Sequence, residues 1–340
     1  MVDSQRNSTI LIAICAALSV LLLSLAGLKQ LRRAEPSQQV EPAESKAEIP
    51  SNDLNSPDAS PDQIAHAKVV DRLAGDTSHV LRLEFDSMIR GSESLDNYIL
   101  RLVKKAKAGD EDSAYFLAEA LMYCALDETM LQQSEALWGI EATDPDIVMA
   151  QLMDKLVGQS EFYRHEARQH ILRGQACRRL GWGTDYYRKQ ARNWRSFAAK
   201  YGQPVALARA ASVDPKETDP VRLEQSKQSF RQVLGQSHDF LTLMYASSVV
   251  SASTGSDYEF ERLAWGLLAC EYAACDSLNF WYRGECDMLS QAGTDVCTSD
   301  MTDIDYLFRR YPAQFDAARA HAQQLKFAVD NGRWDLIGLQ

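Results

Sequence analysis

The sequence predicts an all-α fold behind a membrane anchor and an acidic linker. Three observations support this prediction: an uncharged apolar run near the amino terminus, a stretch rich in Pro, Ser and acidic residues after it, and apolar residues at helical spacing through the rest of the 340-residue chain. Runs of alternating apolar and polar residues, which are typical of β-strands, do not stand out.

The amino-terminal part predicts a single-pass anchor. Residues 1–7 form a short tail, and residues 8–28 read "STILIAICAALSVLLLSLAGL", without a charge. As an α-helix this run would be roughly 30 Å long, about the thickness of a bilayer core. A cleaved signal peptide is the alternative. However, the run exceeds the usual h-region of about 7–15 residues, and no small-x-small cleavage site follows it.

Residues 29–62 form the linker. Between residues 35 and 62 there are seven acidic residues and one basic residue, and the sizeable apolar residues are Val40, Ile49 and Leu54. Such a segment cannot bury enough apolar surface to offset the conformational entropy lost on ordering. We therefore expect a disordered tether that separates residues 63–340 from the membrane.

Residues 63–340 predict helical hairpins. The stretch "LDNYILRLVKKAKAGDEDSAYFLAEALMYCAL" (residues 95–126) has apolar residues on one helical face before and after a break at Gly109-Asp110. The same scheme recurs around Gly202-Gln203-Pro204 and around Thr254-Gly255-Ser256, and Gly181 ends a further helical run. We expect an irregular stack of antiparallel helix pairs, in which each pair covers the apolar face of its neighbour.

Two families share short patterns with the chain. "AKAGDEDSAYFLAEAL", and more weakly "AKYGQPVALARAA", resemble the core of tetratricopeptide-like repeats of the Sel-like class. The Cys-rich segment 270–297 and the ending "FAVDNGRWDLIGL" resemble membrane-anchored or exported bacterial proteins with such helices. This resemblance implies protein binding and supplies no catalytic residue. "LRLEFDSMIRG" resembles the Arg-x-x-Phe-Asp-Tyr block of bacterial lipase foldases, but Ser87 stands where that block has Tyr.

Six cysteines lie outside the predicted anchor, which itself contains Cys15. Zinc sites usually combine C-x₂₋₄-C pairs with nearby histidines. Here ten residues separate Cys286 from Cys297, and no histidine lies between residues 239 and 320. An even number of cysteines in an exported domain favours three disulfides, with reduced or metal-bound cysteines as alternatives.

We predict that Cys124–Cys177 joins two neighbouring helix hairpins, and that the Cys-rich segment pairs locally as Cys270–Cys275 and Cys286–Cys297. A helix over about 278–291, capped by Asp276 or Ser277, would carry Cys286. We expect these bridges to pin irregular segments, without redox activity. The alternative in the Cys-rich segment is a crossed pairing, Cys270–Cys286 with Cys275–Cys297.

The sequence predicts no catalytic residue, cofactor or metal. The patterns G-x-S-x-G, P-loop and G-x-G-x-x-G are missing. "HEARQH" places His165 and His170 five residues apart, about 140° around a helix, which does not suit a shared zinc ion. We interpret both as partly exposed surface histidines.

Charge predicts a docking surface. The chain carries a net charge of −11, yet residues 164–200 hold ten basic and two acidic residues, whereas residues 257–305 hold eleven acidic and two basic residues. Such blocks polarise the field of a domain. The alternatives are a solvated helix face and pairing between the two blocks. We predict an acidic partner at these residues: Arg188, Lys189, Arg192, Trp194 and Arg195.

Together these features predict a non-catalytic, membrane-anchored protein that binds another protein as an adaptor, assembly factor, foldase or immunity protein. We expect the bacterial inner membrane, the soluble domain in the periplasm, and no nucleic acid. The bases Lys29, Arg32 and Arg33 oppose this topology under the positive-inside rule, but the cysteines and the acidic linker favour it. The alternative is a helical envelope hydrolase acting on cell-wall glycan or peptide, with a buried catalytic Glu or Asp.

Overall fold

The computed structural model describes residues 77–91, 94–139, 145–156, 159–272, 275, 277–291, 296–298 and 300–340. The predicted tail, anchor and linker lie outside these residues, as do residues 63–76 of the predicted helical domain. Among the described helices, none combines the length and the apolar character that crossing a bilayer requires.

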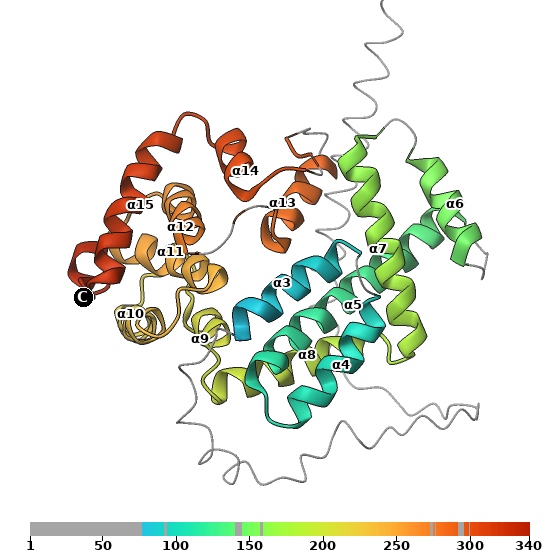
Figure 1. The fold of residues 1–340 in the computed structure, drawn as a ribbon, viewed down its shortest axis with the longest axis horizontal. Coiled ribbons are helices and arrows are strands. Elements are labelled where there is room, and N and C mark those ends of the chain that lie inside the picture. Colours follow the sequence, from blue (N-terminus) through green and yellow to red (C-terminus); the bar gives the residue numbers. More distant parts are fainter. Residues whose placement is uncertain are drawn as a thin grey trace, which may run out of the picture. The chain divides into compact units, whose positions relative to one another are not determined.

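The described part is all-α, as the sequence predicts (Figure 1). It contains thirteen α-helices and one 3₁₀ helix, and no β-strand occurs among the described residues. The helices are α3 (Thr77–Ile89), α4 (Leu95–Lys107), α5 (Glu111–Trp138), α6 (Pro145–Lys155), α7 (Glu161–Leu180), α8 (Thr184–Lys200), α9 (Pro204–Ala211), α10 (Pro220–Leu234), α11 (Phe240–Thr254), α12 (Tyr258–Tyr272), α13 (Phe280–Gln291), α14 (Asp303–Arg310), α15 (Phe315–Asp330) and η1 (Trp334–Ile337).

The long helix α5 organises the first half of the domain. It packs against α3, α4, α7 and α8 (Figure 1). The α4–α5 hairpin turns where the sequence predicts a break. Gly109 has a φ of 89°, a left-handed conformation that glycine adopts without strain. The side chain of Asp110 then accepts a hydrogen bond from the backbone N–H of Ser113 at 3.0 Å, which caps the start of α5.

The second half is built around the α11–α12 hairpin. Helix α11 is buried along most of its length, because α9, α10 and α12 all pack against it. The hairpin turns at Gly255, which has a φ of 70°, at the predicted position. Helix α15 covers α12, and α9 connects the halves through contacts with α8, α10 and α11.

Helix α13 begins two residues later than the sequence predicts, and Asn279 caps it in place of Ser277, whereas Asp276 lies outside the described residues. The Oδ1 atom of Asn279 accepts hydrogen bonds from the backbone N–H groups of Trp281 and Tyr282, at 2.9 and 3.2 Å. Asn279 is itself fixed, because Asp303 accepts hydrogen bonds from its backbone N–H and its side-chain amide at 2.8 and 2.7 Å. A partner 24 residues away in sequence therefore decides where this helix begins.

Three disulfides link these elements with the expected pairing. Cys124–Cys177 joins α5 to α7 with a Cα–Cα distance of 5.4 Å. In the Cys-rich segment the pairs are Cys270–Cys275 and Cys286–Cys297, so the crossed pairing is wrong. In the chain-entropy model, the 53-residue separation of the first bridge corresponds to about 4 kcal/mol of stabilisation.

Candidate functional site

The predicted partner-binding residues lie on α8, which packs against α5 through one face. The inner face buries Tyr187, Gln190, Ala191 and Ala198. Arg188, Lys189 and Arg192 are exposed on the outer side, where residues four apart lie one turn above each other. Among the described residues, Arg188 has a long contact with Asp185, at 3.9 Å. These three cations therefore face solvent together.

Arg195 and Trp194 have a different position. Arg195 is partly buried, and its Nη2 lies 2.9 Å from Oε1 of Glu119 on α5. Arg209 of α9 contacts the same oxygen at 2.7 Å. Trp194 packs edge-on against Phe197, with the ring centroids 5.7 Å apart. Both residues thus contribute to the packing of α8. Of the five predicted partner-binding residues, only Arg188, Lys189 and Arg192 are exposed.

Several other bases of the 164–200 block pair with acids of α4 and α5. The pairs are Arg173–Asp127, Arg178–Glu135 and Arg179–Asp96, at 2.6, 2.6 and 2.8 Å. Between the two blocks, the described residues show a contact of His170 with Asp287, and a pair in which Arg283 of the acidic block meets Glu166 of the basic block. Internal pairing therefore leaves the outer cations of α8 available.

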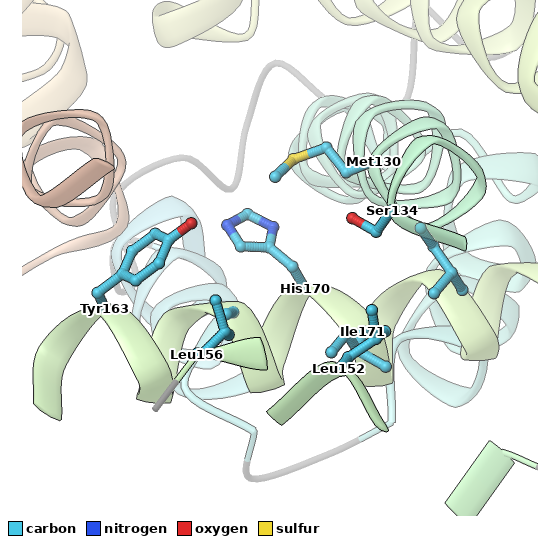
Figure 2. A pocket seen from close by; sticks show the side chains of 9 residues that line it. Met130, Ser134, Leu152, Leu156, Tyr163, His170 and Ile171 are labelled. Atoms are coloured by element: carbon cyan, nitrogen blue, oxygen red, sulfur yellow. The ribbon is translucent and has the colours of Figure 1, made fainter. Parts of the chain in front are cut away.

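A small pocket lies between α5, α6 and α7 (Figure 2). Its cavity of about 70 Å³ is lined by Met130, Leu131, Ser134, Leu152, Leu156, Tyr163, Ala167, His170 and Ile171. The satellite core cluster under α6 supplies three of these, Leu131, Leu152 and Ile171. A cavity of this size has room for a few water molecules or one aliphatic side chain.

His170 projects into this pocket between Tyr163 on one side and Met130 and Ser134 of α5 on the other (Figure 2). Its Nδ1 lies 2.5 Å from Oδ1 of Asp127, and its Nε2 lies 3.1 Å from Oδ2 of Asp287. Asp127 is completely buried, and its Oδ2 accepts a hydrogen bond from Nε of Arg173 at 2.6 Å. We call His170, Asp127, Asp287 and Arg173 the His170 network. It connects α5, α7 and α13.

The network fixes the charge of its members. Burial by itself lowers the pKa of His170, but the charge of Asp127 and the hydrogen bonds to Asp127 and Asp287 outweigh it and raise that pKa to about 9. Burial opposes the charge of Asp127, yet Arg173 and His170 hold its pKa below the usual value. His170 is therefore an imidazolium at neutral pH, with both N–H groups donating to carboxylates.

This geometry suits binding better than proton transfer. A general base needs a pKa near the working pH and a free lone pair, and the protonated His170 offers neither. Burial, with the charge of Asp287, raises the pKa of Tyr163, so its phenol stays protonated as well. Neither His170 nor Tyr163 is therefore suited to act as a general base at neutral pH, and the pocket can accept an apolar group beside a cation.

One group within the described residues brings three side chains of metal-ligating types together: Cys270, Cys275 and Asp303. The two sulfurs are bonded to each other, so they do not serve as thiolate ligands in this state.

The His170 network is not recognisable from the sequence. The local pattern gives no reason to distinguish His165 from His170, but in the structure His170 exposes only 17% of its side chain. Its partners Asp127 and Asp287 lie 43 and 117 residues away in sequence. A buried Asp within an apolar helix is the one local signal, since such residues need a partner.

Comparison with protein-family models, with curated proteins and with solved structures finds no match for this chain.

Proposed function

We propose that this chain is a non-catalytic, membrane-anchored protein of the bacterial envelope whose helical domain binds an acidic protein partner. The observation that carries the proposal is the exposed cation set Arg188, Lys189 and Arg192 on α8. It remains in solvent although neighbouring bases of the block are paired internally. Charges exposed at the edge of a binding surface speed the encounter with a partner of opposite charge and disfavour partners of like charge.

The compartment rests on the disulfides. Three bridges in one domain indicate an oxidising, extracytoplasmic environment. Combined with the apolar run at residues 8–28, this favours a single-pass anchor in the inner membrane with the domain in the periplasm.

The α4–α5 hairpin supports a repeat-like origin for the binding surface. It is an antiparallel pair joined by a Gly-Asp turn, which is the unit that tetratricopeptide-like proteins stack. Such stacks present extended surfaces on which they bind their partners. Here α5 is buried between several helices, whereas α8 keeps a solvent-facing side.

A charge-reversal experiment tests the proposal. The full chain is crosslinked in membranes and captured, and its partner is quantified for the wild type and for Arg188→Glu/Arg192→Glu. We expect capture to fall about tenfold or more, and wild-type capture to weaken with salt. The control Lys104→Glu/Lys105→Glu makes the same change in net charge at exposed positions of α4 and is expected to keep capture. Equal capture by both variants contradicts the proposal.

A further inference from the structure

The Cys270–Cys275 bridge differs from the other two in exposure. Cys124, Cys177 and Cys286 are completely buried, and Cys297 exposes 2% of its surface. Cys270, in the last turn of α12, is partly exposed, and it is the one cysteine of these six that is not buried. Because thiol–disulfide exchange begins with a thiolate reaching a sulfur, access favours this bridge.

A buried carboxyl group lies beside the same bridge. One oxygen of Asp303 and the Sγ atoms of Cys270 and Cys275 all lie within 4.8 Å of one another. Asp303 exposes 1% of its surface and is held in place by its two hydrogen bonds from Asn279. A fixed acid at this distance can exchange a proton with a sulfur through one water molecule.

The charges around Asp303 leave its proton exchangeable. The groups that interact with it are Asp86 and Arg82 of α3 and Tyr282 of α13. Arg82 is shared with Asp86 and Asp239, at 3.4 and 3.5 Å. Burial, reinforced by the charge of Asp86 and opposed by the hydrogen bonds of Asn279, raises the pKa of Asp303 to about 7. Near neutral pH the carboxyl group therefore exists in both protonation states.

We propose that Cys270–Cys275 is a thiol–disulfide exchange site that is reduced by a dithiol protein, with Asp303 as its proton donor and acceptor. This goes beyond the structural role that the sequence predicts for the bridge, and it is independent of the cation set on α8. Because Cys270 is the more exposed cysteine, the incoming thiolate attacks its sulfur. Asp303 lies close enough to give a proton to the leaving sulfur of Cys275.

The exchange proceeds in two balanced steps. A thiolate of the dithiol, whose proton has gone to water, attacks Sγ of Cys270, and a mixed disulfide forms. The Cys270–Cys275 bond breaks with its electron pair on Cys275, which takes the proton of Asp303. The second thiol of the partner then gives its proton to the Asp303 carboxylate and attacks the mixed disulfide. Cys270 leaves as a thiolate and takes a proton from water. The partner's dithiol is oxidised to a disulfide, and the chain's disulfide is reduced to two thiols.

A reduction time course tests the site with internal controls. The full chain in detergent is treated with dithiothreitol at pH 7, samples are alkylated, and the labelled cysteines are quantified by mass spectrometry. We expect Cys270–Cys275 to open about tenfold or more faster than Cys286–Cys297 and Cys124–Cys177, with the circular dichroism unchanged. Equal rates for the three bridges, or opening only together with unfolding, overturn the proposal.

The role of Asp303 is tested separately. Asp303→Asn keeps an oxygen that can accept the backbone N–H of Asn279, and we expect the bridge to open about tenfold more slowly at pH 7. Asp300→Asn, at an exposed position in the same segment, is the matched control and is expected to open at the wild-type rate. If Asp303→Asn does not fold, the wild-type rate per dithiothreitol thiolate is measured against pH and should change with a midpoint near 7. A flat profile, or a wild-type rate in a folded Asp303→Asn variant, overturns the assignment.

Discussion

Two buried charge networks in this domain use the same residue types in different proportions. In the His170 network, the cations His170 and Arg173 serve the carboxylates Asp127 and Asp287. In the second, which we call the Arg82 network, Arg82 lies close to the carboxylates of Asp86 and Asp239 and also acts on Asp303, while Arg90 acts on Asp86 without a close ion pair. Both sets lie in the interior, where an unpaired charge is expensive.

The difference indicates that cations in direct contact with a carboxylate decide its protonation, since burial is similar. Asp127 and Asp303 each expose 1% of their surface. Two cations hold the pKa of Asp127 below its usual value despite its burial. Burial raises the pKa of Asp303 to about 7 and that of Asp86 to about 6, because Arg82 compensates too little. The His170 network stays ionised at neutral pH, and we call it the ionic clamp. In the Arg82 network, carboxyl groups gain and lose protons near neutral pH.

The largest expected effect comes from removing the cation of the clamp. Arg173→Met leaves Asp127 buried beside a single cation and also removes the hydrogen bond to the backbone carbonyl of Ile89. We expect the free energy of unfolding to fall by about 3–5 kcal/mol, measured by urea denaturation at pH 7. The control is Arg179→Met, which breaks an exposed pair on the same helix and should cost less than about 1 kcal/mol. Equal losses would mean that the clamp is not ionic.

Asp303 of the Arg82 network should make the free energy of unfolding depend on pH. Asp303 has a folded pKa of about 7 and an ordinary value of 3.8, so the folded state holds a proton that the unfolded state has already released. Stability from this group is fully present below pH 4 and declines as pH rises through about 7, by about 4 kcal/mol. Urea denaturation across this range measures the slope, and Asp303→Asn should flatten it. An unchanged slope in that variant contradicts the assignment.

His170 should give a smaller effect at higher pH. Its pKa rises from 6.5 to about 9 on folding, so its contribution is fully present below pH 6.5 and is lost as pH rises through about 9, by about 3 kcal/mol. The NMR titration of the His170 ring should have a midpoint near 9, and His170→Gln should remove this loss of stability. His165→Gln assigns the ring signals. A midpoint near 6.5 would show that the two carboxylates do not hold the imidazolium.

Local sequence predicts the elements of this fold well because their causes are local. The break at Gly109-Asp110 is a positive-φ glycine followed by a capping Asp. The ending at Gly181 is a left-handed glycine with a φ of 69°. The Cys270–Cys275 bridge follows from a helix that ends between its two cysteines. Each of these features depends on a few neighbouring residues.

Partners that are distant in sequence account for what the sequence does not reveal. The start of α13 depends on Asp303, and the charge of His170 depends on Asp127 and Asp287. Arg195 turns from the predicted surface because Glu119 of α5 lies beneath it. Periodicity specifies which face of a helix is buried, but it does not specify which charges meet there.

Both proposals require an oxidised domain outside the cytoplasm, so the thiol state in the cell is the most direct measurement. Protein taken directly from cells is denatured without reductant, alkylated and mapped by mass spectrometry. We predict that Cys124, Cys177, Cys286 and Cys297 are unlabelled and disulfide-linked as in the structure, whereas Cys15 is labelled. Labelling of all six cysteines of the helical domain would contradict the extracytoplasmic location and the proposals that rest on it.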